Sequence, residues 1–152
     1  MTCLIFFSCA RDNVMKDGYY TAEALDFDSY GWKEFVSIYV NSGSIVTVEY
    51  NAKNSSGFIK SWDSDYLRTM SRVSGTYPDE YTRSYAEGLL KMQIPDSITA
   101  ISGATESWSY FKLLANAAME QAYRGDKQVV FVTFPEQAGS GVHSPSPSGN
   151  AP

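Results

Sequence analysis

The sequence has very few residues that bind transition metals or act as a base near neutral pH. Its 152 residues include two cysteines, Cys3 and Cys9, and one histidine, His143. Both cysteines lie at the beginning of the chain, and the histidine lies in a tail rich in Gly, Ser and Pro. Histidine-based catalysis and Cys/His metal sites are therefore excluded from the central part of the chain. We expect any chemistry there to come from a bound cofactor.

Basic residues are also in the minority. The chain has 12 Lys and Arg against 17 Asp and Glu, which gives a net charge of -5. A nucleic-acid partner would need a basic face, so we expect no nucleic-acid binding. The sequence has no run of about 18 apolar residues, so no membrane-spanning helix is predicted. A hydrophobic content of 43% instead indicates one globular domain with a single core.

The beginning of the chain is apolar and turns polar at Arg11. Ser8 directly precedes Cys9, which is the arrangement at the processing point of a bacterial lipoprotein signal. The apolar run is shorter than a usual signal core and no basic residue precedes it, so a short first strand is the alternative. We predict lipidation of Cys9. The expected organisation is a signal remnant and tether over 1–15, a domain over 16–135, and a disordered Ser/Pro/Gly tail over 136–152.

Between these ends, the hydrophobic pattern predicts an α+β domain in the order β-β-β-α-α-α-β, with a mainly antiparallel sheet. A hairpin joined by the turn Asn41–Ser44 is the clearest element. The tyrosines of the second helix have the spacing of core residues rather than of a cofactor wall. The predicted strands are 19–25, 33–40, 45–50 and 129–134, a polar turn is predicted at 51–57, and the predicted helices run from Ser64 to Gly75, from Pro78 to before Pro95, and across Trp108 to Gly125.

Ser102-Gly103-Ala104-Thr105 stands directly before the last predicted helix. The first turn of a helix has unpaired N–H groups and a partial positive charge, and small residues allow a phosphate to approach them. Thr105 adds a hydroxyl at the same place. On physical grounds alone, an ordinary loop-to-helix junction explains these residues more simply.

The four residues, with Ser107 and a long helix after them, resemble the flavinylation motif of the FMN-binding domain family. That family includes the C subunit of sodium-pumping NADH:quinone reductase and the G subunit of the Rnf complex. The resemblance implies that an FAD-dependent flavin transferase esterifies the phosphate of FMN to Thr105. It also implies that Ser102, Gly103, Ala104 and Ser107 belong to the cofactor-binding site.

The chain from Asp17 to Arg124 is similar to one branch of this family, the small extracellular electron-transfer lipoproteins of Gram-positive bacteria. This implies a redox carrier that is anchored through Cys9 at the extracellular face of the cell membrane. Its expected electron donor is membrane-bound, either an NADH dehydrogenase or a quinol. The similarity rests on Asp17–Glu23, Gly31–Lys33, Tyr50–Asn54, Gly57, Lys60-Ser61, Asp65-Tyr66 and Met70.

One departure from the family motif keeps other functions open. The motif usually has an acidic residue six positions before the acceptor threonine, where this chain has Thr99. The alternative is a sensor or structural surface lipoprotein of the same fold that binds flavin non-covalently or not at all. A reductase acting on a small substrate is less favoured, because no obvious cluster of Arg, His or acidic residues would hold a substrate. A carrier is therefore preferred to a stand-alone enzyme.

Overall fold

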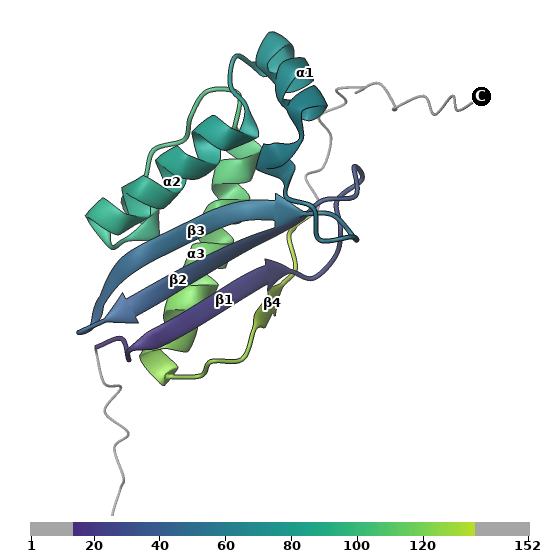
Figure 1. Ribbon diagram of the computed structural model, residues 1–152. Coiled ribbons are helices and arrows are strands. Elements are labelled where there is room, and N and C mark those ends of the chain that lie inside the picture. Colours follow the sequence, from purple (N-terminus) through teal and green to yellow (C-terminus); the bar gives the residue numbers. More distant parts are fainter. Residues whose placement is uncertain (1–13, 136–152) are drawn as a thin grey trace, which may run out of the picture.

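The computed structural model describes residues 14–135 (Figure 1). Within this range the predicted α+β class, the mainly antiparallel sheet and the three helices are confirmed. The elements are β1 (Gly18–Ala24), β2 (Lys33–Asn41), β3 (Ser44–Lys53), the 3-10 helix η1 (Lys60–Trp62), α1 (Ser64–Ser74), α2 (Pro78–Met92), the 3-10 helix η2 (Pro95–Ser97), α3 (Thr105–Arg124) and β4 (Val130–Val132).

The four strands form one sheet in the order β3-β2-β1-β4. β1, β2 and β3 are antiparallel neighbours, and β4 lies parallel to β1. The predicted hairpin is confirmed, and its turn has positive φ at Ser42 (53°) and Gly43 (76°), as a tight two-residue hairpin requires. The predicted polar turn at 51–57 is wrong for residues 51–53, which continue β3. Their polar Asn51 is accommodated in the strand because its side chain bonds to Ser61.

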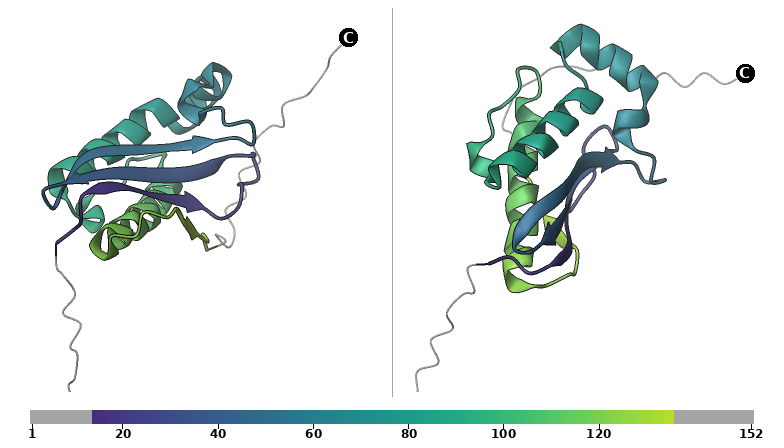
Figure 2. Two further views of the ribbon diagram at one scale, coloured as in Figure 1. Left: turned by 60° about the horizontal axis from the view of Figure 1, so that its bottom comes forward. Right: turned by 60° about the vertical axis from the view of Figure 1, so that its left-hand side comes forward.

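Both long helices cover the same face of the sheet, as the three views together show (Figures 1 and 2). α3 packs on β1 and β2, and α2 packs on β3. Tyr81, Tyr85 and Leu89 of α2 are buried, so their prediction as core residues is confirmed. Met92 follows them at helical spacing but is 52% exposed, because it is the last residue of the helix.

The inner face of α3 changes from bulky to small residues along the helix. Phe111 and Leu114 are fully buried, and Ala115, Ala118 and Ala122 follow them into the core. The alanines have little side chain to separate helix and sheet, so α3 can lie close to β1 and β2. The helix ends at Gly125, which has the left-handed conformation of a C-cap (φ 73°).

α1 differs from the other helices because it has no buried residue. Its predicted bounds are confirmed: Asp63 caps its first turn by accepting from the N–H groups of Asp65 and Tyr66, and Gly75 ends it with φ 72°. Val73 on its predicted apolar stripe is 74% exposed. α1 therefore contributes little to the core. Within residues 14–135, no helix combines the length and apolar character needed to span a membrane.

Candidate functional site: a cleft at one end of the sheet

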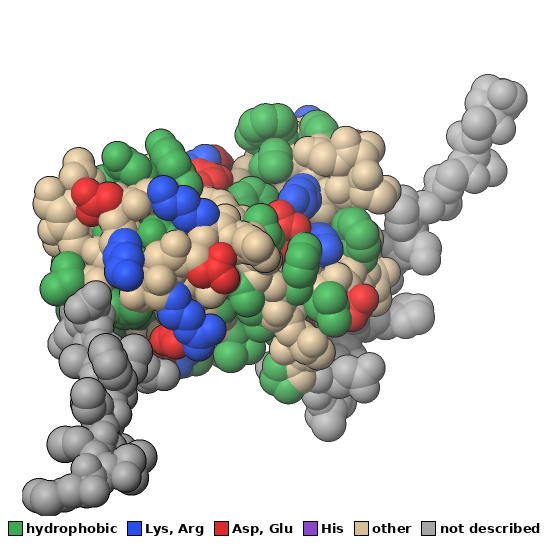
Figure 3. Space-filling view, turned by 90° about the horizontal axis from the view of Figure 1, so that it is seen from below, with side chains coloured by type: hydrophobic (Ala, Val, Ile, Leu, Met, Phe, Trp, Pro, Cys, Tyr) green, Lys and Arg blue, Asp and Glu red, His purple; other side chains and the backbone are tan. Residues whose placement is uncertain are grey.

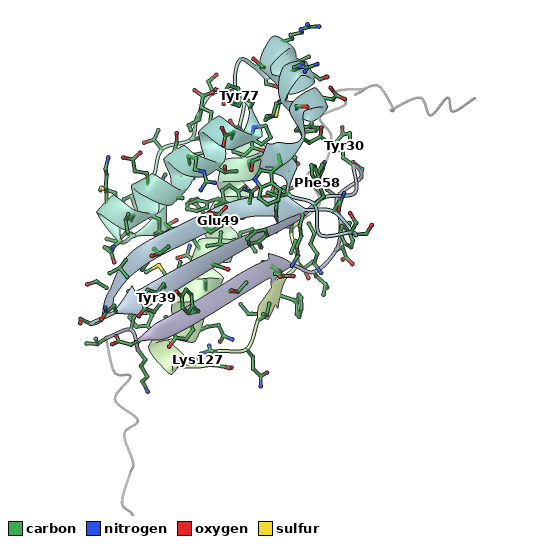
Figure 4. All side chains as sticks on the ribbon, viewed as in Figure 1. Tyr30, Tyr39, Glu49, Phe58, Tyr77 and Lys127 are labelled. Atoms are coloured by element: carbon green, nitrogen blue, oxygen red, sulfur yellow. The ribbon has the colours of Figure 1, made fainter. Side chains whose placement is uncertain are left out.

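A cleft of about 470 Å³ lies at the end of the sheet where β1 stops. Its walls come from the β1–β2 connection and the adjoining strand ends, from η1, from α1, from Tyr81 of α2, from the residues around the start of α3, and from the end of β4 and the residues after it. Figure 4 places Tyr30, on the β1–β2 connection, at this end of the molecule. The chain enters β1 at the opposite end (Figure 1). The volume lies within the range of small-molecule and cofactor sites, which is roughly 300–1,000 Å³.

Asp28 organises the wall that the β1–β2 connection forms. Its carboxylate accepts hydrogen bonds from the backbone N–H of Tyr30 (2.9 Å) and of Trp32 (2.8 Å). Its own N–H donates to the carbonyl of Trp32 at 2.7 Å. This closed turn fixes Trp32, which lines the cleft and is 7% exposed.

Lys60 enters the cleft from η1. The neighbouring Ser61 is bonded to buried Asn51 of β3, whose side-chain N–H donates to Ser61 Oγ at 2.9 Å. This contact ties η1 to the sheet and fixes the backbone that carries Lys60. The side chain of Lys60 lines the cleft although the residue is only 6% exposed.

The Lys60 ammonium lies over two aromatic rings, 4.9 Å from the ring centre of Tyr66 and 5.9 Å from that of Trp32. Among the described residues, none forms a hydrogen bond or an ion pair with its Nζ. Burial by itself would lower the pKa of Lys60, but electrostatic interactions with Tyr81, Tyr66, Glu34 and Asp28 outweigh burial and raise it. Lys60 is therefore a largely buried cation in the wall of the cleft, without a hydrogen-bond or ion-pair partner among the described residues.

Glu34 is the second buried ionisable group of the cleft. It lies on the inner face of β2 and is 8% exposed. Tyr50 Oη donates to Glu34 Oε2 at 2.6 Å and lies 2.9 Å from the backbone carbonyl of Ser107. Burial raises the pKa of Glu34 to about 7, against the lowering effects of Lys60 and of the Tyr50 hydrogen bond. The carboxyl can hold a proton near neutral pH.

Thr105 is the first residue of α3 and is exposed at the edge of the cleft. It does not line the cleft itself, but Gly103, Ala104, Glu106 and Ser107 around it do. No side chain caps this end of the helix. The predicted acceptor hydroxyl is thus accessible from solvent next to residues that reach the cleft.

The small residues before Thr105 also have packing roles. Gly103 has φ 82°, and a side chain there would meet the carbonyl oxygen of Ser74 at 2.2 Å. Ala104 is buried, and its carbonyl accepts from the Tyr85 hydroxyl at 3.0 Å. Ser102 is exposed. The absence of a side chain at Gly103 is therefore explained by α1, and a role of these residues toward a cofactor stays a prediction.

Two aromatic residues follow the motif on α3, and they behave differently. Trp108 packs against the core and donates from Nε1 to the carbonyl of Ile98 at 2.8 Å. Tyr110 lines the cleft and stacks on Phe134, with ring centres 4.0 Å apart and nearly parallel. Tyr110 thus belongs to the site and Trp108 does not line it.

Thr99 is exposed on the loop before the motif. Asp96, the nearest preceding acid, forms an ion pair with Lys112 at 3.1 Å on the outer side of α3. Asp96 is not among the residues that line the cleft. It therefore does not supply there the acidic side chain that the family motif has at the position of Thr99.

Sequence analysis missed the buried polar cluster of Glu34, Tyr50 and Lys60. One signal was present: Glu34 has the same phase in its strand as Val36, Ile38 and Val40, all of which are buried. A carboxylate in the inward phase of a strand indicates a buried group with a special environment. Lys60 carried no comparable signal, because its burial depends on how η1 folds over the end of the sheet.

The chain has relatives of known sequence and structure, although no protein-family model matches it. It is 36% identical over 114 residues to the 15 kDa lipoprotein of Treponema pallidum (strain Nichols), across 75% of this chain and 81% of the relative. The crystal structure of the CPE2226 protein from Clostridium perfringens is similar with a TM-score of 0.76 and 36% identity, over 80% of this chain and 99% of that one. A solution NMR structure from Clostridium thermocellum has a TM-score of 0.51 and 34% identity, over 71% and 92% of the two chains.

Proposed function

The chain belongs to the family of the 15 kDa lipoprotein of Treponema pallidum, and on that premise we propose that it is a lipid-anchored carrier of FMN. In this proposal Cys9, which lies outside the described residues, carries the lipid, and Thr105 carries FMN through a phosphodiester. The anchor holds the domain at the extracellular face of the membrane, where a membrane-bound NADH dehydrogenase or quinol supplies electrons. A single acyl chain binds membranes only marginally, so Cys9 is expected to be diacylated.

The position of Thr105 is the observation that supports the proposal most. Its hydroxyl is exposed at the first residue of a 20-residue helix, beside a cleft of the size that cofactors occupy. The flavin transferase would bring FAD to this hydroxyl. Thr105 Oγ attacks the phosphorus on the FMN side of the pyrophosphate, the P–O–P bond breaks, AMP leaves, and the hydroxyl proton passes to a base on the transferase or to water.

The residues of the cleft fit such a cofactor. Trp32, Tyr66 and Tyr110 offer aromatic walls, and Lys60 offers a buried cation without a hydrogen-bond partner among the described residues. The uncapped N-terminus of α3 carries partial positive charge that would offset the single negative charge of a phosphodiester. When bound, FMN supplies the transfer of one or two electrons. The chain holds and orients it, limits water, and can keep a proton on Glu34.

The experiment is the intact mass of the full chain with Cys9→Ser, co-expressed with an active flavin transferase. We expect a mass gain of one FMN less one water. Thr105→Ala should abolish the gain, and Thr69→Ala, which removes another exposed helical threonine, should leave it unchanged. Absence of the gain in the parent chain, while the same transferase modifies another target, would contradict covalent attachment.

Non-covalent flavin binding is favoured by one feature, the Thr99 side chain in place of the usual acid. In that case flavin would come off the protein on denaturation. Thr99→Asp restores the carboxylate and should raise the rate at which Thr105 is modified. If the rate is unchanged, the acid has no role in transfer to this chain.

A reductase is favoured by the buried carboxyl of Glu34 in the cleft. A turnover assay of flavin-loaded protein with small acceptors tests it, using wild type beside Glu34→Gln. A reductase that uses Glu34 as its acid should lose about 10²–10⁴-fold in turnover in the variant. A carrier should show no acceptor-specific turnover in either protein.

A further inference from the structure

A largely buried cation, Lys60, lines the cleft. Lys60 is 6% exposed and, among the described residues, it has neither a hydrogen bond nor an ion pair. Removing an ammonium group from water is costly, and cation–π contacts return only a part of that cost. The charged or titratable groups around Lys60 are Glu34, Asp28, Tyr66 and Tyr81. None of them lies within ion-pair or hydrogen-bonding distance of it.

The surroundings of Lys60 indicate the ligand that would use it. Trp32 and Tyr66 lie beside the ammonium, and both line the cleft. Thr105, in contrast, is exposed at the rim. A ligand tied at Thr105 through a phosphate would therefore place its phosphate at the rim and its ring system toward the aromatic interior. The ring end is the part that would meet Lys60.

We propose that Lys60 is the ligand-recognising cation of the cleft and donates hydrogen bonds to acceptor oxygens on a planar aromatic ring system. The inference rests on the proposed function, under which that ring system is the flavin of FMN. Lys60 thereby also places positive charge beside the ring, where added electrons make the ring more negative. It acts on the ring rather than on the phosphate.

The test uses the full chain with Cys9→Ser and Thr105→Ala, so that covalent loading does not enter. Free FMN and free riboflavin are titrated against this protein and against its Lys60→Met variant, with Trp fluorescence as the signal. Lys112→Met is the matched control, because Lys112 also lies over a tryptophan, Trp108, but on the outer side of α3. Lys60→Met should weaken the binding of both flavins by roughly tenfold to a hundredfold, and Lys112→Met should change neither affinity.

The stability of the ligand-free protein separates a role of Lys60 in binding from a role in folding. An apolar side chain of similar length in place of a buried charge is often neutral or stabilising. We expect Lys60→Met to keep or raise the urea midpoint of the ligand-free protein while it loses flavin affinity. A lowered midpoint with unchanged flavin affinity would assign Lys60 to folding and overturn the proposal.

The remaining outcomes separate this inference from the proposed function. If Lys60→Met weakened the binding of FMN but not of riboflavin, Lys60 would be assigned to the phosphate and recognition of the ring would be overturned. Failure of both flavins to bind the parent protein would also overturn recognition of the ring. Lys60-dependent binding of both flavins without transferase-dependent mass gain would support the inference and contradict covalent attachment. A mass gain on Thr105, with flavin binding unaffected by Lys60→Met, would support covalent attachment and overturn the inference on Lys60.

Discussion

At the scale of single residues, Glu34 makes the stability of the protein depend on pH. Its pKa is about 7 in the fold against 4.5 for an ordinary carboxyl, because burial favours the neutral form. Between these values the folded chain holds a proton that the unfolded chain has lost. The stabilisation is therefore fully present below the unfolded pKa and is lost as pH rises through about 7.

Replacement by glutamine should remove this pH dependence. The contribution of Glu34 to the free energy of unfolding should fall by about 3 kcal/mol between pH 4.5 and pH 8 in wild type. Urea unfolding of wild type and Glu34→Gln at several pH values measures the difference between the two curves. Parallel curves would mean that Glu34 is ionised in the fold throughout this range.

Gly103 is the residue of the motif whose identity the fold explains most directly. Its φ is 82° and the site of a Cβ lies 2.2 Å from the Ser74 carbonyl oxygen, so Gly103→Ala adds a clash to an unfavourable backbone conformation. We expect it to lower the free energy of unfolding by about 3 kcal/mol or more.

Gly57→Ala is the control for Gly103→Ala. Gly57 has nearly the same φ, 84°, but open space where its Cβ would be. It should cost only about 1–2 kcal/mol, which is the backbone penalty alone. Thermal or urea unfolding gives both values. Equal losses would show that the contact with Ser74 relaxes without cost.

At the scale of elements, α1 should open more readily than α2 or α3. None of its residues is buried, while seven residues of α3 are buried. Val73→Ala in α1 should change the free energy of unfolding by less than about 0.5 kcal/mol. Leu114→Ala in α3 should cost about 2–5 kcal/mol.

Hydrogen exchange tests the same contrast without mutation. Amides of α1 should exchange through local openings well before those of α3. Because α1 lines the cleft with Tyr66 and Met70 and α2 with Tyr81 alone, a ligand in the cleft should slow exchange in α1 more than in α2. Uniform exchange across the three helices would contradict this account.

The elements also show how far the sequence alone leads. The bounds of α1 and the C-terminus of α3 were predictable because each has a local signal, Asp63 and Gly75 for α1 and Gly125 for α3. The hairpin was predictable from its alternating β-branched runs. The continuation of β3 through Asn51 was not, because the residue is polar and its bond to Ser61 forms only in the folded chain.

The site was predictable only where it has a sequence motif. Ser102–Thr105 was placed correctly at the start of the last helix. The cleft beside it was not foreseen, since its lining comes from separate parts of the chain between Ala24 and Pro135. Lys60 and Glu34 meet there through tertiary packing, and no spacing in the sequence relates them.

At the scale of the whole molecule, surface charge is mixed rather than concentrated on the face seen from below Figure 1. Figure 3 shows basic, acidic and hydrophobic side chains interspersed over the face seen from below Figure 1. Under the proposed function, association with a redox partner is therefore expected to depend on where the cleft points as well as on charge. That direction is set by β1, which runs seven residues from the chain entry to the cleft.

Under the proposed function, a longer tether should change electron transfer from a membrane-bound donor but not from a soluble reductant. We expect that inserting about ten Gly/Ser residues between Cys9 and Val14 raises the rate at which a membrane-bound quinol donor reduces the flavin-loaded, lipidated protein. The rate with a soluble reductant should be unchanged, since the cleft itself is untouched. Equal rates with the membrane donor, with and without the insertion, would show that the short tether already allows the cleft to reach it.

Strand β1 thus acts as a spacer as well as a part of the sheet. Seven residues of extended chain span roughly 20 Å, so a domain tied down at the start of β1 has its cleft at the far pole. Such a molecule would face outward at rest, with its cofactor turned toward the surroundings. Collecting electrons from the membrane would then require the domain to tip over on its tether, and this tipping would separate loading from delivery in time.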